Sequence, residues 1–476
     1  MFKNKYFPFY LISFSILILL IIPTLIQDGM FMDGIQYAIV SKNLAFGKGT
    51  FWFPYLTDTW YKAGSIYFME HPPLVYGIQA IFFKLFGSSI YTERIYSFTT
   101  AIISAFLIIK LWKISVKTKN KDLAFIPVVL WIIIPVVFWT YQNNLQENTL
   151  SIFALLSIIN IILFTKNLKY INLIFAGLFI FLSAMCKGIP GLFPLTGFIA
   201  YNIAFKNKLG KKNTIKYSLI LMLIIIVTFL LLMLNDTANK SINFYIFKRL
   251  LFRIDQEPTV NNRFYILYRL ISELLLPLSI VFVSFIIFKI KKITILITKT
   301  DKQYFMFFLL IALSASIPLI ITKVQRGFYL IPAFPFFALA LSFLIKNKYA
   351  GFFNKIINNK HKYIITKYLS IFLFIFSVSF SVTKIGKISR NKDIINTVNK
   401  IGNNIPKGSI ITTSKDIYNN WYLQFYLYRK YNISLNYNKK PKKYFLTSKN
   451  YTTQETKNLK KLNLNLTNYS LFVKNK

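Results

Sequence analysis

Long apolar runs recur along most of this sequence, and they constrain the fold more than any other feature. Each approaches the roughly 20 residues that a helix needs to cross a bilayer core. The runs cover residues 6–26, 92–112, 123–141, 147–165, 170–186, 189–206, 216–234, 267–289, 304–322, 327–346 and 363–383. Backbone polar groups at this depth are satisfied only inside helices. The sequence therefore predicts an all-α polytopic membrane protein with about eleven transmembrane helices.

The charge of the chain indicates its orientation rather than a nucleic-acid partner. The formal net charge is +43, from 58 Lys+Arg and 15 Asp+Glu. The lysines lie mainly in short loops between apolar runs, and every second connection is basic. Basic loops favour the cytoplasmic face. We therefore expect a multi-pass protein with a cytoplasmic N-terminus, and an odd number of spans would leave the C-terminus on the outer face.

The other connections would then lie outside: a first outer loop over 27–91, short turns at 142–146, 187–188 and 323–326, a later loop over 235–266, and the tail from about 384. Within the first loop, residues 76–86 form an apolar run too short to span, which predicts a helix lying at the membrane interface. From about Lys387 the apolar periodicity changes. We predict a membrane domain over 1–386 and a small α/β extracytoplasmic domain over 387–476. Its expected helices are 391–403 and 417–429, and its expected strands are 409–413, 444–447 and 469–473.

The first outer loop gathers acids in a chain that has few of them. It contains Asp28, Asp33, Asp58, Glu70 and His71. A carboxylate that is partly desolvated at a membrane interface would have a raised pKa and could accept a proton from an acceptor hydroxyl. We therefore predict that Asp33 is a catalytic residue. A helix cap or a solvated loop acid would also fit its position.

Glu147 lies at the outer end of the fourth run, where an ionisable side chain is costly and often functional. It is a second candidate catalytic acid. Asp33, Glu147 and His71 together offer oxygen and nitrogen ligands for a divalent metal cation. An acid reaching water and a histidine that orders its loop are the alternatives. No glycine-rich phosphate loop is present, so we expect no nucleotide cofactor.

Several other side chains at the outer ends of the runs are candidate substrate-binding residues. Cations there would suit a phosphate or diphosphate, and arginine adds bidentate geometry. Each would also fit a lipid headgroup contact, and an acid beside an arginine would also fit an internal ion pair. The tyrosine among them opens a proline-broken stretch that could line a cavity. The candidates are His71, Glu93, Arg94, Lys187, Arg249, Arg253, Lys323, Arg326 and Tyr329.

Four stretches, in order along residues 1–345, resemble the GT-C membrane glycosyltransferases. They are MDGIQYAIVSKNLA, HPPL followed by LFGSSIYTERIYS, LSAMCKGIPGLFPL, and YLIPAFPFFALAL. The chain is similar in particular to bacterial relatives of the protein O-mannosyltransferases and of the aminoarabinose transferase that modifies lipid A. The resemblance implies the GT-C fold and an inverting transfer from a polyprenyl-phosphate sugar. It also implies a place in the bacterial inner membrane, with the reaction on the outer side.

The resemblance further implies roles for individual residues. Asp33 matches the acceptor-activating carboxylate, and Glu147 matches a position associated with metal binding. Lys187 matches the lysine of the KG turn, and Arg249 or Arg253 matches basic residues that contact the carrier phosphate. Two departures are visible: many relatives have an acid where this chain has Gly34, and Glu147 replaces a more usual aspartate.

We therefore predict a glycosyltransferase with a lipid, glycan or protein acceptor. One alternative is a flippase or transporter for a lipid-linked glycan, which would carry charges near the bilayer midplane and paired repeats. Another is a polysaccharide polymerase or ligase, which would place its main outer loop late in the chain. A scaffold whose tail binds a partner is the non-enzymatic alternative. The polar residues at the outer ends of the runs, and a large first outer loop, favour the transferase.

Overall fold

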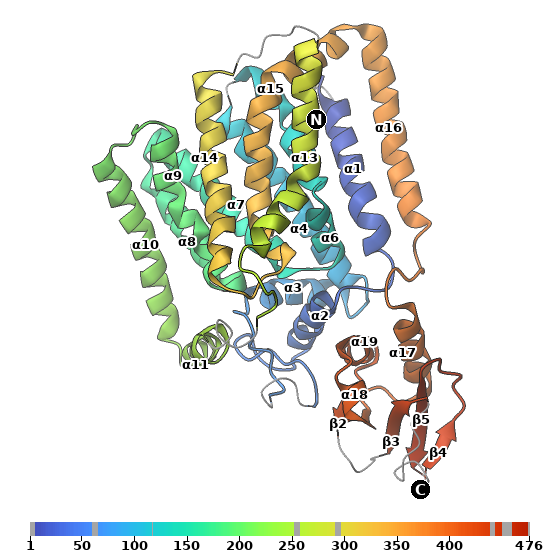
Figure 1. Ribbon diagram of the computed structural model, residues 1–476. Helices are drawn as coiled ribbons and strands as arrows, with labels where there is room; N and C mark the ends of the chain where they lie inside the picture. The colour runs from blue at the N-terminus through green and yellow to red at the C-terminus, as the bar shows by residue number, and fades with distance from the viewer. Residues whose placement is uncertain are drawn as a thin grey trace. The chain divides into compact units, whose positions relative to one another are not determined.

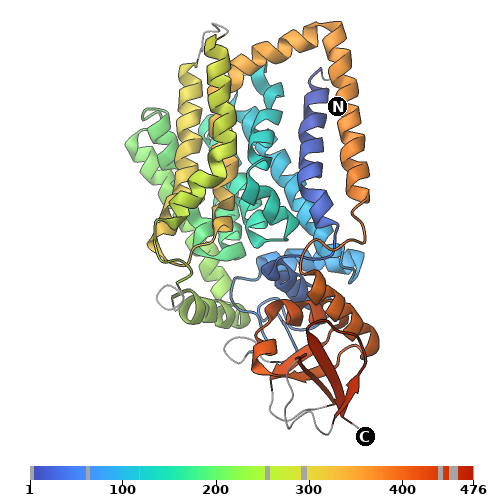
Figure 2. The ribbon, with the colours of Figure 1, turned by 45° about the vertical axis from the view of Figure 1, so that its right-hand side comes forward.

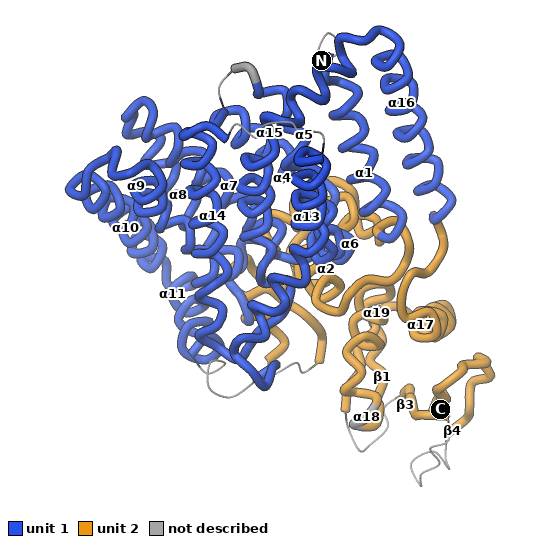
Figure 3. Tube along the Cα trace, turned by 45° about the horizontal axis from the view of Figure 1, so that its top comes forward, with its two compact units in different colours: residues 1–24, 70–75, 97–384 blue, residues 25–69, 76–96, 385–476 orange. Residues whose placement is uncertain are grey.

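The computed structural model describes residues 5–59, 65–116, 118–251, 258–290, 297–437, 443–449 and 459–474. Its contacts divide the chain into two compact units, drawn in different colours in Figure 3. Unit 1 contains residues 1–24, 70–75 and 97–384. Unit 2 contains residues 25–69, 76–96 and 385–476. Each unit therefore combines segments that lie far apart in the sequence.

Nine helices in the described part of the chain are long and apolar enough to cross a membrane. Their composition and the fold confirm the prediction of an all-α polytopic membrane protein. They are α1 (Phe7–Leu25), α4 (Thr92–Ser115), α7 (Gln146–Asn167), α8 (Tyr170–Lys187), α10 (Lys211–Met233), α13 (Tyr265–Ile290), α14 (Lys299–Ser316) with η5 (Ile317–Ile321), η6 (Gly327–Ala333) with α15 (Phe334–Asn358), and α16 (Lys360–Val382).

The other two predicted spans differ from simple transmembrane helices. The third is broken into α5 (Phe125–Ile132), which follows η2 (Thr118–Leu123), and α6 (Pro135–Gln142), and the two halves are bent by 81°. The break follows from Pro135, because the residue before a proline is pushed into extended backbone. Ile134 has φ −66° and ψ 122°. The sixth is the short apolar pair η3 (Ile189–Thr196) and α9 (Gly197–Ala204).

The helices of unit 1 differ strongly in burial. Only 11% of the most apolar stretch of α10 is buried within the protein, against 83% for the stretch that includes α15. α10 lies at one edge of the unit, followed by the short α11 (Asp236–Asn243), and α1 and α16 lie side by side at another (Figures 1 and 2). Phe14 of α1 and Phe374 of α16 are in contact, with their ring centres 6.3 Å apart. The exposed apolar faces of α10 and α16 suit contact with lipid tails.

Unit 2 contains α2 (Met32–Ala45), most of α3 (Leu74–Phe86), and the C-terminal helices α17 (Lys392–Asn404), α18 (Lys415–Tyr418) and α19 (Trp421–Tyr431). A five-stranded sheet completes it, in the order β2-β1-β3-β5-β4. The strands are β1 (Ile410–Thr413), β2 (Ser434–Tyr437), β3 (Tyr444–Ser448), β4 (Leu459–Leu462) and β5 (Tyr469–Lys474). β1 pairs in parallel with β2 and β3, whereas β5 is antiparallel to β3 and β4.

These elements confirm the predicted α/β character of the C-terminal segment. The expected helices correspond to α17 and to α18 with α19, and the three expected strands correspond to β1, β3 and β5. β2 and β4 were missing from the prediction. Their sequences, SLNY and LKKL, are short and carry few apolar residues, so the alternating pattern that marks a strand is weak.

A buried charge network holds several segments of unit 2 together. Arg429 of α19 is 3% exposed, and its Nη2 lies 2.6 Å from an oxygen of Glu93. Arg94 pairs with Glu93 at 3.2 Å, and its Nη2 lies 4.0 Å from Asp28. Lys430 pairs with the same Asp28 at 2.6 Å. The structure thus places Glu93 in contact with Arg94 and with Arg429 of α19. The proposed substrate-binding role of Glu93 and Arg94 stays a prediction.

Lys42 of α2 gives unit 2 an expected dependence on pH. Its ammonium donates to the Arg429 carbonyl at 3.2 Å and to Asn432 Oδ1 at 2.6 Å. Burial, together with the nearby Arg429 charge, lowers its pKa from 10.5 to about 7. Between these two pH values the unfolded chain holds a proton that the folded chain has released. Stability should therefore rise with pH from about 7 to 10.5, by up to about 1.4 kcal/mol per pH unit. Below about pH 7 the cost of burying the charge is present in full.

Thermal unfolding at several pH values between 6 and 10 checks this expectation. The variant Lys42→Met should lose the rise, because no group at that position titrates. Lys84→Met removes an exposed lysine from α3 and is the matched control. Parallel stability curves for the wild type and Lys42→Met would contradict the assignment.

Candidate functional site

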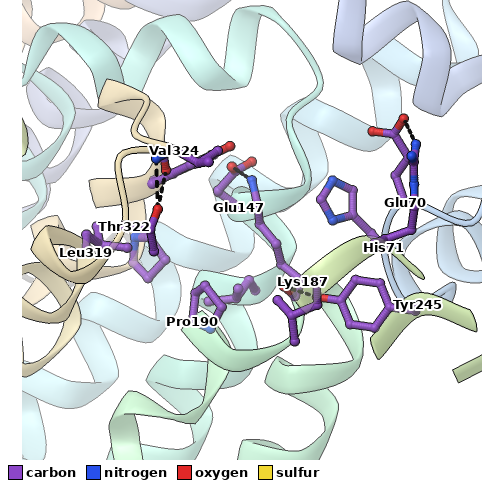
Figure 4. A pocket seen from close by; sticks show the side chains of 14 residues that line it. Glu70, His71, Glu147, Lys187, Pro190, Tyr245, Leu319, Thr322 and Val324 are labelled. Carbon is purple, nitrogen blue, oxygen red and sulfur yellow. Dashed lines mark hydrogen bonds and ion pairs between the residues drawn. The ribbon is translucent and has the colours of Figure 1, made fainter. Parts of the chain in front are cut away.

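A pocket in unit 1 brings charged side chains from four segments against an apolar wall. Its cavity volume is about 150 Å³. The apolar part of its wall is formed by leucine, valine and proline side chains. The lining residues are Glu70, His71, Glu147, Leu150, Lys187, Pro190, Tyr245, Arg249, Leu250, Leu319, Thr322, Val324, Tyr329 and Pro332 (Figure 4).

Glu147 and Lys187 form a buried ion pair in this pocket (Figure 4). Their side chains are 2% and 9% exposed. Glu147 lies in the first turn of α7 and Lys187 in the last turn of α8. A helix N-terminus favours an acid and a helix C-terminus favours a cation, so both charges occupy the helix ends that stabilise them. The second oxygen of Glu147, Oε2, makes no hydrogen bond within the described part of the chain.

Aromatic rings and a glycine fix the position of Lys187. Its ammonium lies 4.2 Å from the ring centre of Tyr329 and 5.3 Å from that of Phe328, close enough for cation–π attraction. Gly188 ends α8 with φ +81°, and a side chain there would collide with the Tyr245 hydroxyl. That hydroxyl donates to the Lys187 carbonyl at 3.3 Å. The turn therefore needs glycine both for its backbone angle and for the close approach of Tyr245.

A second ion pair joins Glu70 and Arg249 at 2.5 Å (Figure 4). Glu70 is 9% exposed and Arg249 is 21% exposed. Arg249 belongs to η4 (Phe244–Leu250), a π-helical turn, and such turns are frequent at functional sites. In Figure 4 the His71 imidazole lies between this pair and the Glu147–Lys187 pair. Two acids and two cations thus lie around one apolar-walled cavity, each acid next to a cation.

Five residues that the sequence singles out as candidates line this one pocket. They are His71, Glu147, Lys187, Arg249 and Tyr329. They come from segments that are up to 258 residues apart, counted from residue 71 to residue 329. Other candidates lie elsewhere. Lys323 and Arg326 are exposed and do not line the cavity, and Arg253 lies outside the described residues.

Asp33 belongs to unit 2, where it lies in the first turn of α2 and is partly exposed. The N-cap of that helix is Phe31, so Asp33 is not the cap residue. Its charge suits the positive end of the helix. Tyr37, one turn later, is buried, with its ring 5.8 Å from that of Tyr76.

Sequence reasoning missed Gln325, which organises the loop leading into η6. Its side chain is 1% exposed. Its Nε2 donates to the carbonyls of Arg263 at 2.6 Å and Thr322 at 2.8 Å, while its Oε1 accepts from the Ile266 amide at 2.9 Å. A glutamine in a loop carries no pattern that marks such a role. Tyr245 was also missed, because its partner Lys187 lies 58 residues away.

The predicted metal site involves Asp33, Glu147 and His71, of which Glu147 and His71 line the pocket. Within the described residues, no group of three or more His, Cys, Asp or Glu side chains is arranged to hold a metal ion. Glu147 is paired with the Lys187 ammonium, which supplies a positive charge beside this carboxylate. The roles of Asp33, Glu147 and His71 as metal ligands stay predictions.

The fold is that of the GT-C membrane glycosyltransferases. A family model described as dolichyl-phosphate-mannose-protein mannosyltransferase matches residues 70–232, a range that includes Glu70, His71, Glu147 and Lys187. No curated protein sequence matches the chain.

Two solved structures are similar to this chain along most of its length. ArnT from Cupriavidus metallidurans, bound to undecaprenyl phosphate, has a TM-score of 0.64 at 9% identity, over 97% of both chains. The archaeal oligosaccharyltransferase AglB from Archaeoglobus fulgidus, in complex with an inhibitory peptide and a dolichol-phosphate, has a TM-score of 0.53 at 13% identity. That match covers 94% of this chain and 70% of the AglB chain. At these identities the similarity establishes a shared fold.

Proposed function

We propose that this protein is a membrane glycosyltransferase that moves a sugar from a polyprenyl-phosphate donor to a lipid, glycan or protein hydroxyl. The observation that carries the proposal is the pocket in unit 1, in a chain with the GT-C fold. Two cations, Lys187 and Arg249, line this pocket together with apolar side chains. Such a pocket suits an amphiphile with a phosphate head. The titles of the similar structures name lipids of this chemistry, undecaprenyl phosphate and dolichol-phosphate.

Arg249 and Lys187 would hold the phosphate of the donor. Transfer of the sugar leaves negative charge on that phosphate, and preorganised cations in a water-poor site stabilise such charge. Each cation is held by an acid before the donor binds, Arg249 by Glu70 and Lys187 by Glu147. The acids would keep the cations in place and reduce the cost of an empty, positively charged cavity.

Asp33 would accept the proton of the acceptor hydroxyl as that oxygen attacks the anomeric carbon. Attack from the face opposite the phosphate inverts the configuration at that carbon. Glu147 is the second proposed catalytic acid, and within the described residues its Oε2 makes no hydrogen bond and is available for a hydroxyl of substrate or for a bound cation. A divalent cation stays an optional component, and its contribution would be measured as transfer before and after chelation with EDTA.

The proposed location is the bacterial inner membrane, with a cytoplasmic N-terminus and the C-terminal α/β segment outside. The alternation of basic loops supports this orientation. A lipid-linked sugar and its acceptor would then meet at the outer leaflet. Cysteine labelling of single-cysteine variants in intact cells would test the orientation.

Release of polyprenyl phosphate is the direct test of the function. Purified full-length protein would be incubated with a labelled polyprenyl-phosphate sugar, with and without an extract of cell-envelope acceptors. We expect polyprenyl phosphate to appear only when acceptor is present. Movement of the intact donor across a vesicle membrane without release would favour the flippase. Growth of a glycan chain on its own lipid carrier would favour the polymerase.

Arg249→Lys is expected to raise the KM for the donor about tenfold while changing kcat less. Lysine keeps the charge but loses the planar, bidentate fork that matches a phosphate. Steady-state kinetics at varied donor concentration would measure both constants. Lys323→Gln is the matched control, because Lys323 is exposed and does not line the pocket. A larger donor KM for Lys323→Gln than for Arg249→Lys would contradict the assignment.

A further inference from the structure

A second cavity lies in unit 1, between α6, α13 and the start of η6. Its volume is about 320 Å³, against about 150 Å³ for the pocket described above. Three aromatic residues, a proline and a single arginine–glutamate pair dominate its walls. The lining residues are Pro135, Val136, Phe138, Trp139, Arg269, Glu273, Gly327 and Phe328.

The Arg269–Glu273 pair in this cavity lies at the break between α5 and α6. Glu273 is 3% exposed, and its Oε2 accepts a hydrogen bond from the Val136 amide at 2.8 Å. That amide belongs to the first turn of α6, so a helix N-terminus helps to stabilise the buried carboxylate. The other oxygen, Oε1, lies 2.7 Å from Nη2 of Arg269. The acid is therefore satisfied from two sides.

Arg269 is the open member of the pair. Its side chain is 42% exposed, whereas that of Glu273 is 3% exposed. Within the described residues only Nη2 of its guanidinium is engaged by a carboxylate. The backbone of Gly327 packs against the Arg269 side chain. A Cβ atom at this position would lie only 2.8 Å from Nε of Arg269, so a larger residue would displace the guanidinium. A planar cation thus lies at the mouth of the cavity with donors to spare.

The residues around Arg269 indicate that it lies at the depth of the lipid head groups. Aromatic residues are exposed at the beginning of α13 and just before it: Phe264 by 62%, Tyr265 by 40% and Tyr268 by 71%. Exposed aromatic rings at the end of an apolar span are typical of the membrane–water interface. Further along the same helix Ile271 and Leu275 are exposed and apolar, as expected for contact with lipid tails.

Phe328 separates this cavity from the candidate site. Its ring centre lies 6.1 Å from that of Trp139, which lines the second cavity. On the other side it lies 5.3 Å from the ammonium of Lys187, which lines the first. The two cavities are thus neighbours, because Phe328 contacts a residue that lines each of them.

We propose that Arg269, Trp139 and Phe328 form a second, lipid-facing site that binds the phosphate head of an anionic membrane lipid. Arg269 donates to the phosphate through the nitrogens that Glu273 leaves open. The rings of Trp139 and Phe328 contact the glycerol or the first carbons of the tail. Glu273 acts as a positioning residue that holds the guanidinium. The inference stands on this cavity and does not depend on the sugar-transfer reaction.

Quenching of Trp139 fluorescence by brominated lipids tests the site on the full-length protein in nanodiscs. The chain has 6 tryptophans, so the signal of Trp139 is obtained as the difference between the wild type and Trp139→Phe. The probes are dibrominated phosphatidic acid and dibrominated phosphatidylcholine at equal mole fractions. Charge-assisted hydrogen bonds to a phosphate monoester predict half-maximal quenching at about tenfold less phosphatidic acid.

Arg269→Gln should bring the two lipids within about twofold of one another, because glutamine cannot supply the charge. Arg269→Lys should retain part of the preference. Arg263→Gln, which alters an exposed arginine outside the cavity, should leave the preference unchanged. If Arg269→Gln unfolds, the double variant Arg269→Gln/Glu273→Gln removes the unpaired buried acid and replaces it in the test.

Two outcomes would overturn the proposal. One is equal quenching by both lipids in the wild type, which would mark the cavity as a nonspecific contact with lipid tails. The other is loss of the phosphatidic acid preference when millimolar inorganic phosphate is added, which would mark a site for a free anion. Activity assays with the same variants separate this proposal from the transferase proposal, since either can fail while the other holds.

Discussion

Lys187→Met is expected to lower the free energy of unfolding by about 3–5 kcal/mol, the usual cost of leaving a buried charge without its partner. Glu147 is 1% exposed and pairs with Lys187. Without the ammonium its carboxylate would either stay charged in an apolar wall or take up a proton. Thermal or denaturant unfolding in detergent micelles would measure the loss.

The double variant Glu147→Gln/Lys187→Met makes this prediction specific. It has no charge left to bury, so it should recover most of the lost stability. Sugar transfer should stay absent, because both the cation and the acid are gone. A double variant as unstable as Lys187→Met would show that the pair is not coupled. Recovery of transfer in the double variant would remove both residues from the mechanism.

Asp33→Asn is expected to lower kcat for transfer by a factor of about 10²–10⁴, the range that general-base catalysis contributes. Asparagine is close in size, and it cannot accept the proton of the acceptor hydroxyl. The donor KM should change little, since Asp33 is not assigned to phosphate binding. Steady-state kinetics with a labelled donor would measure the effect, and thermal unfolding would establish that the variant is folded.

Asp58→Asn is the control for this second prediction. Asp58 lies, like Asp33, in residues 25–69 of unit 2 and accepts a hydrogen bond from the Tyr55 hydroxyl at 2.8 Å, so we expect its role to be structural. Transfer by this variant should stay within about twofold of the wild type, since the substituted amide can still hydrogen-bond Tyr55. Full transfer by Asp33→Asn would exclude that carboxylate as the base.

The sequence predicted the transmembrane helices well because the bilayer leaves few solutions. A run such as 147–165 must be helical to satisfy its backbone, and α7 spans Gln146–Asn167. The same logic failed at 123–141. Its apolar composition predicts one span, whereas Pro135 divides it into two helices bent by 81°. Hydrophobicity summed over the run does not reveal the effect of a single proline. The break nevertheless starts a new helix, and the Val136 amide in its first turn donates a hydrogen bond to Glu273.

The pocket shows a similar division. Position at the predicted outer end of an apolar run was enough to single out Glu147 and Lys187. That these two form a pair was invisible, because they are 40 residues apart and on different helices. Glu70 and Arg249 are 179 residues apart. No local pattern relates residues at such separations.

The compact units also depart from the order of the chain. The sequence predicts a membrane domain over 1–386 followed by a separate domain over 387–476, and that division stays a prediction. The structure groups residues 385–476 with 25–69 and 76–96 in unit 2. Arg429 and Lys430 of α19 reach Glu93 and Asp28 in that unit. A single domain boundary along the sequence cannot describe contacts between segments so far apart in the chain.

The amino-acid sequence alone determined that this chain is helical and crosses a membrane several times, since apolar length and backbone hydrogen bonding permit little else. It also determined which side chains are chemically unusual, because the chain has only 15 acids and because an ionisable side chain at the end of an apolar run is costly. Only the tertiary structure decided which of them meet. Pairing and burial depend on helix packing between segments distant in sequence, and that packing sets the charge, shape and water content of each cavity.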